Sequence, residues 1–172
     1  MQTRIHFIEE LSRLNHDVLS MGARVEESLR QALEALKTQN VDLAQEVKAR
    51  DELINAMQLK IEDQAAVLIA TQQPVARDLR FLTAAIKINA DLERMGDLAV
   101  NIVERALSLI YQPPVKPLID IPQMAKLVES MVRRSLDAFV KRDPELARAV
   151  LLSDDAVDEL RDAIYHLSLI HI

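Results

Sequence analysis

The segment DLERMGDLAVNIVE at 91–104 carries acidic side chains at spacings that place them on one side of a helix. With about 100° of rotation per residue, Glu93, Asp97, Asn101 and Glu104 form one stripe at the edge of an apolar face. Glu93 and Asp97 are like charges one turn apart, and Glu93 has no basic residue three or four positions away in either direction. Carboxylates crowded in this way near apolar surface need a cation, a proton or basic side chains from another helix.

Two interpretations of this acidic stripe follow from the residues. Ion pairs with Arg or Lys side chains of neighbouring helices would make it an ordinary surface stripe. Alternatively, its carboxylate and amide oxygens suit a hard cation such as Mg²⁺, Ca²⁺, Mn²⁺ or iron. A ferritin-like di-iron site would need Glu-x-x-His motifs. The residues three positions before the four histidines are Thr3, Arg13, Ala163 and Ser168, which argues against that type of site.

Motifs for catalysis are missing from the sequence. It has no Gly-rich phosphate loop, no Gly-x-Ser-x-Gly elbow and no His-Glu-x-x-His helix. The absence of cysteine excludes a Cys nucleophile, a disulfide framework and a Cys-based zinc site. A metal-dependent hydrolase built on a helical bundle would need inward-facing His or Asp ligands on several helices, which the histidines do not supply. We therefore expect a protein that is not an enzyme.

The stripe requires a helix to carry it and further helices to support that one. Apolar residues at alternating spacings of three and four predict helices over about 4–38, 41–71 and 74–111. Asn40 is expected to cap the second helix, and Pro74 is expected at the first position of the third. Gly96 falls in the middle of the third helix's apolar face, where a missing side chain lets another helix approach closely.

The chain repeats itself after a shift of 103 positions. The pattern of the first two helices recurs without a gap over about forty residues, including the turn, where Asp143 is the expected cap and Pro144 the first helical residue. The intervening segment YQPPVKPLIDIP cannot be helical throughout because of its prolines. We therefore expect an internal duplication, with domains at 1–112 and 123–172 joined by a linker at 113–122.

The expected fold is all-α, with tandem three-helix bundles of antiparallel, spectrin-like helices. The second bundle is expected to be incomplete, because 123–172 has room for only two helices. The apolar stripe that would then be exposed is rare on a soluble monomer. This favours a chain that is a C-terminally truncated fragment of a longer protein.

Composition supports this fold class and limits the functions. About half the residues are apolar, only 3% are aromatic and only two are glycine, which favours helices with an aliphatic core. The net charge of −6 argues against a nucleic-acid surface. No apolar run approaches the roughly 18 residues of a membrane span, and the N-terminal MQTRIHFIEE contains no signal-peptide core. We therefore expect a soluble, intracellular protein.

The motifs QPVARDLR at 73–80 and KINADLERMGDLAVNIVE at 87–104 resemble the PhoU family, the accessory regulators of bacterial phosphate transport. The opening LNHDVLSMGARVEESLRQALEAL resembles the same family, and the resemblance covers residues 5–165. It implies two tandem three-helix bundles. The family's signature is an acidic residue followed four positions later by Asp on the third helix of each repeat, which matches Glu93 and Asp97 here.

The resemblance also implies a metal site and a regulatory role. Glu93 and Asp97 would bind a cation such as iron, Mn, Mg or Zn, with Asn101 and Glu104 assisting. The protein would act in the cytoplasm, as a homodimer, as a negative regulator of phosphate uptake and of phosphate-regulon signalling. Its partners would be the ATPase of the phosphate ABC transporter and the phosphate-sensing histidine kinase. The alternative is a structural helical-bundle interaction protein without a ligand, which would not need the unpaired carboxylates.

Overall fold

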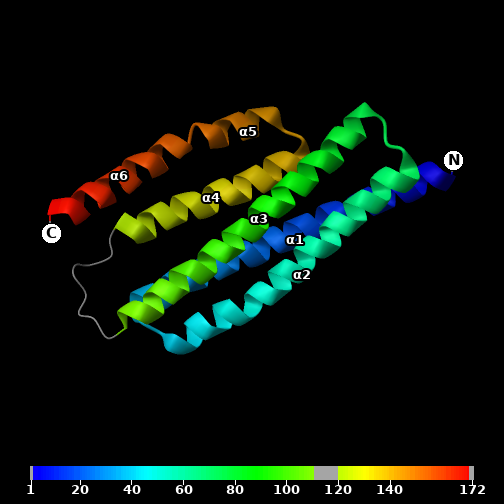
Figure 1. Ribbon diagram of the computed structural model, residues 1–172. Helices are drawn as coiled ribbons and strands as arrows, with labels where there is room; N and C mark the ends of the chain where they lie inside the picture. The colour runs from blue at the N-terminus through cyan, green and yellow to red at the C-terminus, as the bar shows by residue number, and fades with distance from the viewer. Residues whose placement is uncertain (1, 111–119, 171–172) are drawn as a thin grey trace. The chain divides into compact units, whose positions relative to one another are not determined.

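The computed structural model describes residues 2–110 and 120–170, and these residues form α-helices joined by short turns (Figure 1). In chain order the helices are α1 Gln2–Thr38, α2 Val41–Gln72, α3 Ala76–Leu109, α4 Asp120–Lys141, α5 Pro144–Leu151 and α6 Asp154–Ile170. The described ranges contain no β-strand, so the all-α prediction is confirmed. The chain divides into two compact units, Met1–Ser108 and Leu109–Ile172, called unit 1 and unit 2 below.

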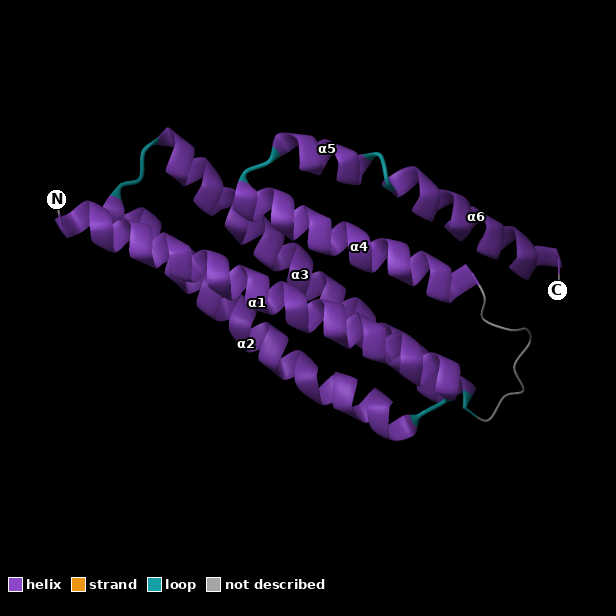
Figure 2. Ribbon diagram, turned by 180° about the vertical axis from the view of Figure 1, so that it is seen from behind, coloured by secondary structure: helices purple, strands orange, loops and turns teal. Residues whose placement is uncertain are grey.

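Unit 1 is an antiparallel three-helix bundle in which α1, α2 and α3 lie side by side (Figures 1 and 2). Its core is aliphatic, as the composition predicts, and each helix contributes residues at helical spacing. The core side chains that are at most 1% exposed include Leu14, Val18, Met21, Val25, Ile54, Ile61, Leu82 and Val103. Asn89 is as deeply buried, and its amide nitrogen donates to the backbone oxygen of Gln58 at 2.9 Å. That bond fixes the register of α3 against α2.

The turn between α1 and α2 forms as predicted. Asn40 has an extended backbone (φ −84°, ψ 107°), and its side-chain oxygen accepts a hydrogen bond from the Leu43 amide at 3.0 Å. This bond satisfies one of the amides that a helix N-terminus leaves without a partner. The residue before the cap, Gln39, takes the left-handed conformation with φ 53°, which lets the chain reverse.

The predicted start of the third helix is wrong by two residues. The helix begins at Ala76, and the Val75 carbonyl accepts from the amides of Asp78 at 2.8 Å and Leu79 at 3.0 Å. Pro74 therefore lies before the helix. The chain reverses direction after α2 at residues 73–75, where Gln73 takes the left-handed conformation with φ 46°. The predicted end at residue 111 lies outside the described residues, and α3 ends at Leu109.

Unit 2 contains α4, α5 and α6, and α4 packs against both of the others. Helix α4 begins at Asp120, so Ile121 and Pro122, which were expected in the linker, lie in its first turn. A proline is tolerated there because the first amides of a helix have no carbonyl partner. The rest of the expected linker, 113–119, lies outside the described residues. Asp143 caps α5 as predicted, accepting from the amides of Glu145 and Leu146 at 3.0 Å each.

The structure shows three helices in unit 2 where two were expected. The second is interrupted at Leu152 and Ser153, which separate α5 from α6. The Ser153 hydroxyl donates to the Ala149 carbonyl at 2.9 Å and accepts from Arg134 of α4 at 3.2 Å. A serine hydroxyl that bonds to the carbonyl one turn earlier competes with the helical ladder. Asp154 then begins α6, where a negative charge favours a new N-terminus.

The duplication is visible in the backbone itself. Gln39 and Arg142 are related by the same shift of 103 positions, and both have φ 53° directly before their helix cap. No helix in the described part of the chain is long and apolar enough to cross a lipid bilayer.

Candidate metal centre

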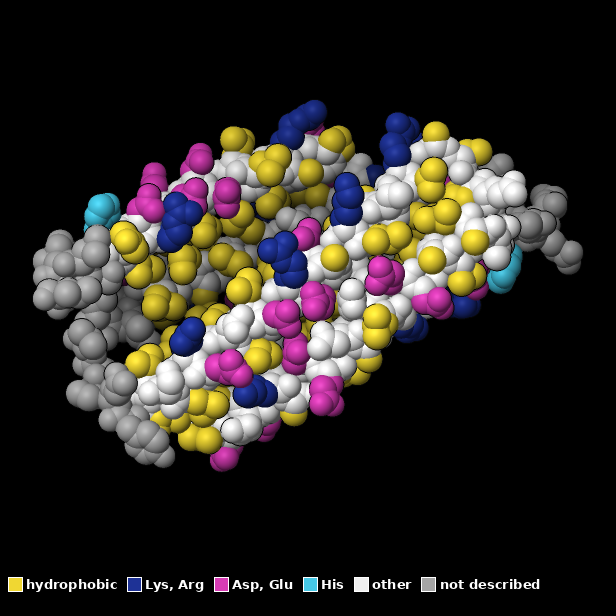
Figure 3. Space-filling model, in the orientation of Figure 1, with side chains coloured by type: hydrophobic (Ala, Val, Ile, Leu, Met, Phe, Trp, Pro, Cys, Tyr) yellow, Lys and Arg dark blue, Asp and Glu magenta, His cyan; other side chains and the backbone are white. Residues whose placement is uncertain are grey.

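The acidic stripe lies on α3, which holds its four residues at the rim of the unit 1 core. Glu93 is half-buried, whereas Asp97, Asn101 and Glu104 are exposed. A space-filling view of this face shows acidic side chains over α3 and the adjoining part of α2 (Figure 3). Among residues 2–110 and 120–170, no three acidic or histidine side chains gather closely enough to make a ready metal site.

Glu104 takes part in an ion pair. Its carboxylate accepts from the Lys48 ammonium of α2 at 2.8 Å. The hydrogen bond and the charge of Lys48 hold the pKa of the Glu104 carboxyl below its ordinary value. The basic partner that Glu104 lacks on its own helix is therefore supplied by α2, as the ion-pair interpretation of the stripe requires.

Glu93 and Asp97 are placed differently, because neither forms an ion pair with any residue in the described ranges. Asn101 is exposed, as expected for the outer part of the stripe. Gly96, which directly precedes Asp97 in the sequence, is buried and faces the core. Within the stripe, Glu104 is thus neutralised by a lysine, whereas Glu93 and Asp97, called the acidic pair below, are not.

Gly96 brings α2 and α3 close together at the acidic pair. A Cβ atom at Gly96 would lie 3.2 Å from Cγ2 of Ile54 and 3.3 Å from Oδ1 of Asp51. These distances are at the short limit of ordinary contacts, so the predicted role of this glycine in close packing is confirmed. Because the side chain is missing, the carboxylate of Asp51 can reach the surface of α3.

Asp51 is a candidate ligand that the sequence analysis did not identify. Its Oδ2 accepts from the Asn55 amide at 3.1 Å, but its Oδ1 is buried and has no hydrogen-bond partner. Burial raises the pKa of the Asp51 carboxyl above its ordinary value, and the nearby negative charge of Asp97 raises it further. The one feature of the sequence that singles out Asp51 is the internal repeat, because a shift of 103 positions aligns Asp51 with another aspartate, Asp154.

The site brings negative charge from α2 and α3 close together. The Asp51 and Asp97 carboxylates repel one another, and one buried oxygen of Asp51 lacks a donor. A hard cation would relieve both conditions, because carboxylate oxygens are its preferred ligands. Asp51, Asp97 and Glu93 do not by themselves gather into a three-carboxylate metal site. Water or other ligands would have to complete the coordination of a bound cation.

Comparison with known proteins gives one consistent result. A family model described as the PhoU domain matches residues 18–106 and 121–172. The PhoU homolog of Aquifex aeolicus, named a phosphate-specific transport system accessory protein, is 43% identical over 88% of this chain and 69% of its own. The homolog of Caulobacter vibrioides, which carries the same name, is 40% identical over 91% of this chain and 69% of its own.

Solved structures agree with the sequence relatives. The crystal structure of PhoU from Pseudomonas aeruginosa superposes with a TM-score of 0.89 at 32% identity, covering 95% of this chain and 79% of that one. The phosphate transport system regulatory protein PhoU from Streptococcus pneumoniae gives a TM-score of 0.84 at 32% identity, covering 91% and 74%. The sequence relatives and the solved structures are thus the PhoU proteins that the motifs of α3 resemble. The chain belongs to the PhoU family.

Proposed function

We propose that this chain is a cytoplasmic regulator of phosphate homeostasis that negatively regulates phosphate uptake and phosphate-regulon signalling. The observation that carries the proposal is the relationship to proteins named phosphate-specific transport system accessory proteins, at 43% identity over 88% of the chain. The proposed contacts are with the ATPase of the phosphate ABC transporter and with the phosphate-sensing histidine kinase. Long helices support such contacts, because they present extended faces to partner helices.

A bacterium that lacks its own family member provides the test. Expression of this chain is expected to restore repression of a phosphate-starvation reporter in phosphate-rich medium and to reduce phosphate uptake. The tagged chain is also expected to recover the transporter ATPase and the sensor kinase from detergent-solubilised membranes. A reporter that stays active, together with recovery of neither partner, would contradict the proposal. Cross-linking of the purified chain tests the proposed homodimer separately.

We further propose that Glu93, Asp97 and Asp51 hold a metal cation between α2 and α3, with iron, Mn, Mg or Zn as candidates. Support comes from the buried, unpartnered Oδ1 of Asp51 and from the charge of Asp97 beside it. Asn101 and Glu104 remain the outer candidates of the same stripe. Glu104 is the less suited of the two, because Lys48 already binds its carboxylate.

Metal content of the purified chain distinguishes these ligands. Asp97→Asn and Asp51→Asn are expected to lose most of the bound metal after reconstitution and desalting, as measured by mass spectrometry. Asp91→Asn is the matched control, because Asp91 is an exposed carboxylate on the same helix. Glu104→Gln is expected to keep its metal. Equal metal content in all four variants would reject the site and would favour the alternative function, a helical-bundle interaction protein without a ligand.

A further inference from the structure

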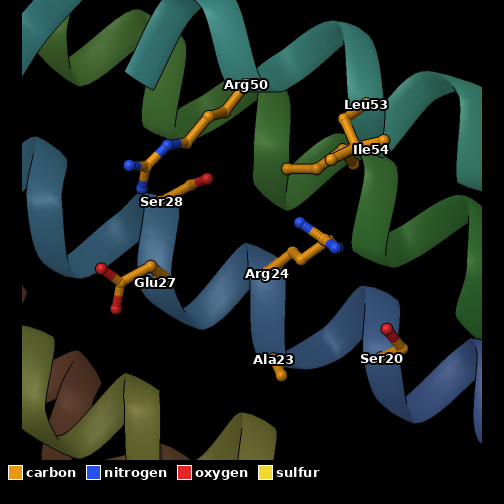
Figure 4. Close-up of a pocket in the computed structure, with 8 residues that line it drawn as sticks. All are labelled: Ser20, Ala23, Arg24, Glu27, Ser28, Arg50, Leu53 and Ile54. Carbon is orange, nitrogen blue, oxygen red and sulfur yellow. The ribbon is translucent and has the colours of Figure 1, made fainter. Parts of the chain in front are cut away.

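A groove of about 470 Å³ opens between α1 and α2 in unit 1. Arg24 and Ser28 come from α1, one turn apart, and Arg50 and Ile54 come from α2. Figure 4 shows the guanidinium groups of both arginines in the space between the two helices, with the Ser28 hydroxyl on the α1 side. The candidate metal ligands do not line this groove, so it is a separate feature of the bundle.

Arg50 is held in position and still has donors to offer. Its Nη1 donates to Oε1 of Gln31 at 2.5 Å, and its Nη2 donates to Oε2 of Glu46 at 3.3 Å. A guanidinium has five N–H donors in a planar fork, so these two bonds leave others available. A side chain fixed in this way loses little entropy when it binds a further acceptor.

Arg24 forms no ion pair with any residue of the described ranges. The carboxylate that could neutralise it on the same helix is Glu27, three positions later. Arg30 binds that carboxylate instead, with its Nε 3.1 Å from Oε2. Arg24 therefore offers an uncommitted charge to the groove. Among the residues that line the groove, Arg24 and Arg50 outnumber Glu27, although the whole chain has a net charge of −6.

The groove combines the groups that recognise a phosphate ester. Two guanidinium forks on facing helices match the oxygens of a phosphate group, and Ser28 lies beside them as a hydroxyl donor. Leu53, which is 44% exposed, supplies apolar surface on the α2 wall for the carbon part of a ligand, and the buried Ile54 also lines the groove. The volume is within the range of small-molecule sites and exceeds what a lone phosphate ion would fill.

We propose that this groove binds a phosphorylated small molecule, with the phosphate group between Arg24 and Arg50 and the remainder against Leu53. The role in phosphate transport is not needed for this inference, which comes from the charges and hydroxyls of the groove alone. A regulator with such a groove would respond to a metabolite as well as to its protein partners.

Titration calorimetry with AMP and with inorganic phosphate, at constant ionic strength, tests the proposal. Saturable binding is expected, and Arg24→Gln and Arg50→Gln are each expected to weaken it by roughly tenfold or more, the size of one hydrogen bond to a charged group. Arg105→Gln is the matched control, because Arg105 is an exposed arginine of α3 outside the groove. Arg24→Lys, which keeps the charge and loses the fork, is expected to recover only part of the affinity.

Amide chemical shifts provide the second measurement, and the helical circular dichroism of each variant shows that it is folded. Ligand-induced shifts are expected at Ser20, Arg24 and Ser28. Tighter binding of AMP than of phosphate assigns the ester as the ligand, whereas equal binding assigns the free anion. Absence of saturable binding to either probe, or equal weakening by Arg105→Gln, overturns the proposal. The reporter and recovery experiments would still decide the regulatory role separately.

Discussion

Unit 1 and unit 2 contain the same turn but differ in what surrounds it. Gln39 and Arg142 share φ 53°, and each precedes a side-chain cap on the next helix. In unit 1 the helices on either side of the turn are closed over by α3. In unit 2 the buried apolar side chains of the described residues are Leu136, Ala138 and Val150, which are 6%, 4% and 7% exposed, while Leu151 and Leu152 are 73% and 76% exposed. Two residues specify the turn, but a core as extensive as that of unit 1 requires a long helix packed over both neighbours, as α3 is in unit 1.

The largest test of this difference compares a buried leucine of unit 1 with an exposed leucine of unit 2. Leu82→Ala in α3, at a side chain with 0% exposure, is expected to lower the free energy of unfolding by about 2–5 kcal/mol, because it leaves a cavity. Leu152→Ala in unit 2 removes an exposed side chain and is expected to change that free energy by less than about 0.5 kcal/mol. Urea denaturation followed by circular dichroism measures both. Similar losses would show that Leu152 packs against other side chains in solution, contrary to its exposure in the structure.

Gly96→Val tests whether the close approach of α3 to α2 accounts for the difference. The added side chain would meet Ile54 and Asp51, so a loss of about 1–3 kcal/mol is expected from overpacking. Leu98→Val is the control for β-branching on the same helix, since Leu98 is 56% exposed. Adding Ile54→Ala to Gly96→Val is expected to recover part of the loss. A variant as stable as its control would show that the helices can separate at no cost.

The two caps test what the units share. Asn40→Ala and Asp143→Ala are each expected to cost about 1 kcal/mol, because both remove the side-chain acceptor at a helix N-terminus. Thermal unfolding of the two variants, measured side by side, checks the expectation. A clearly larger cost for one of them would show that surrounding structure, rather than the repeated turn, controls its stability.

The smallest expected effect separates Asp51 from Asp154, which occupy equivalent positions of the repeat. Burial raises the pKa of the Asp51 carboxyl in the folded state, so the stability it contributes is greatest below the unfolded value near 3.8 and is lost as pH rises through the raised value. In metal-free buffer at neutral pH, Asp51→Asn is therefore expected to stabilise unit 1. Asp154→Asn is expected to destabilise unit 2 by about 0.3–1 kcal/mol, because it removes a negative charge from the first turn of α6.

Denaturation at several pH values measures both variants. The advantage of Asp51→Asn over the unmodified chain should grow as pH rises above about 3.8 and disappear in stronger acid. Effects of the same sign at both positions would contradict the assignment of Asp51 as a half-buried carboxyl with one oxygen that lacks a hydrogen-bond partner.

The features that were correctly predicted are mostly local. The caps at Asn40 and Asp143 depend on residues within one turn, and the identity of the core positions depends on spacing along one helix. The break at Ser153 was not foreseen, because the pattern on both sides of it is compatible with one continuous helix. It depends on the hydroxyl's bond to Ala149 and on Arg134 of another helix.

The candidate site shows the same limit. Spacing on α3 identified Glu93 as a carboxylate without a basic neighbour on its own helix, and neither Glu93 nor Asp97 forms an ion pair with a described residue. The Lys48 partner of Glu104 and the approach of Asp51 both depend on how α2 packs against α3, across more than forty residues of sequence. The spacing of residues along one helix cannot predict contacts between residues that lie so far apart in the sequence.

The repeated turn also bears on the speed of folding. Each turn joins two helices through a very short connection, so the first tertiary contacts form between residues close in sequence. Contacts of this kind require little loop closure, and helical proteins dominated by them fold in microseconds to milliseconds. Each hairpin can therefore begin to form on the ribosome before the rest of its unit has been synthesised. In unit 1, α3 would then pack last, against a hairpin of α1 and α2 that has already formed.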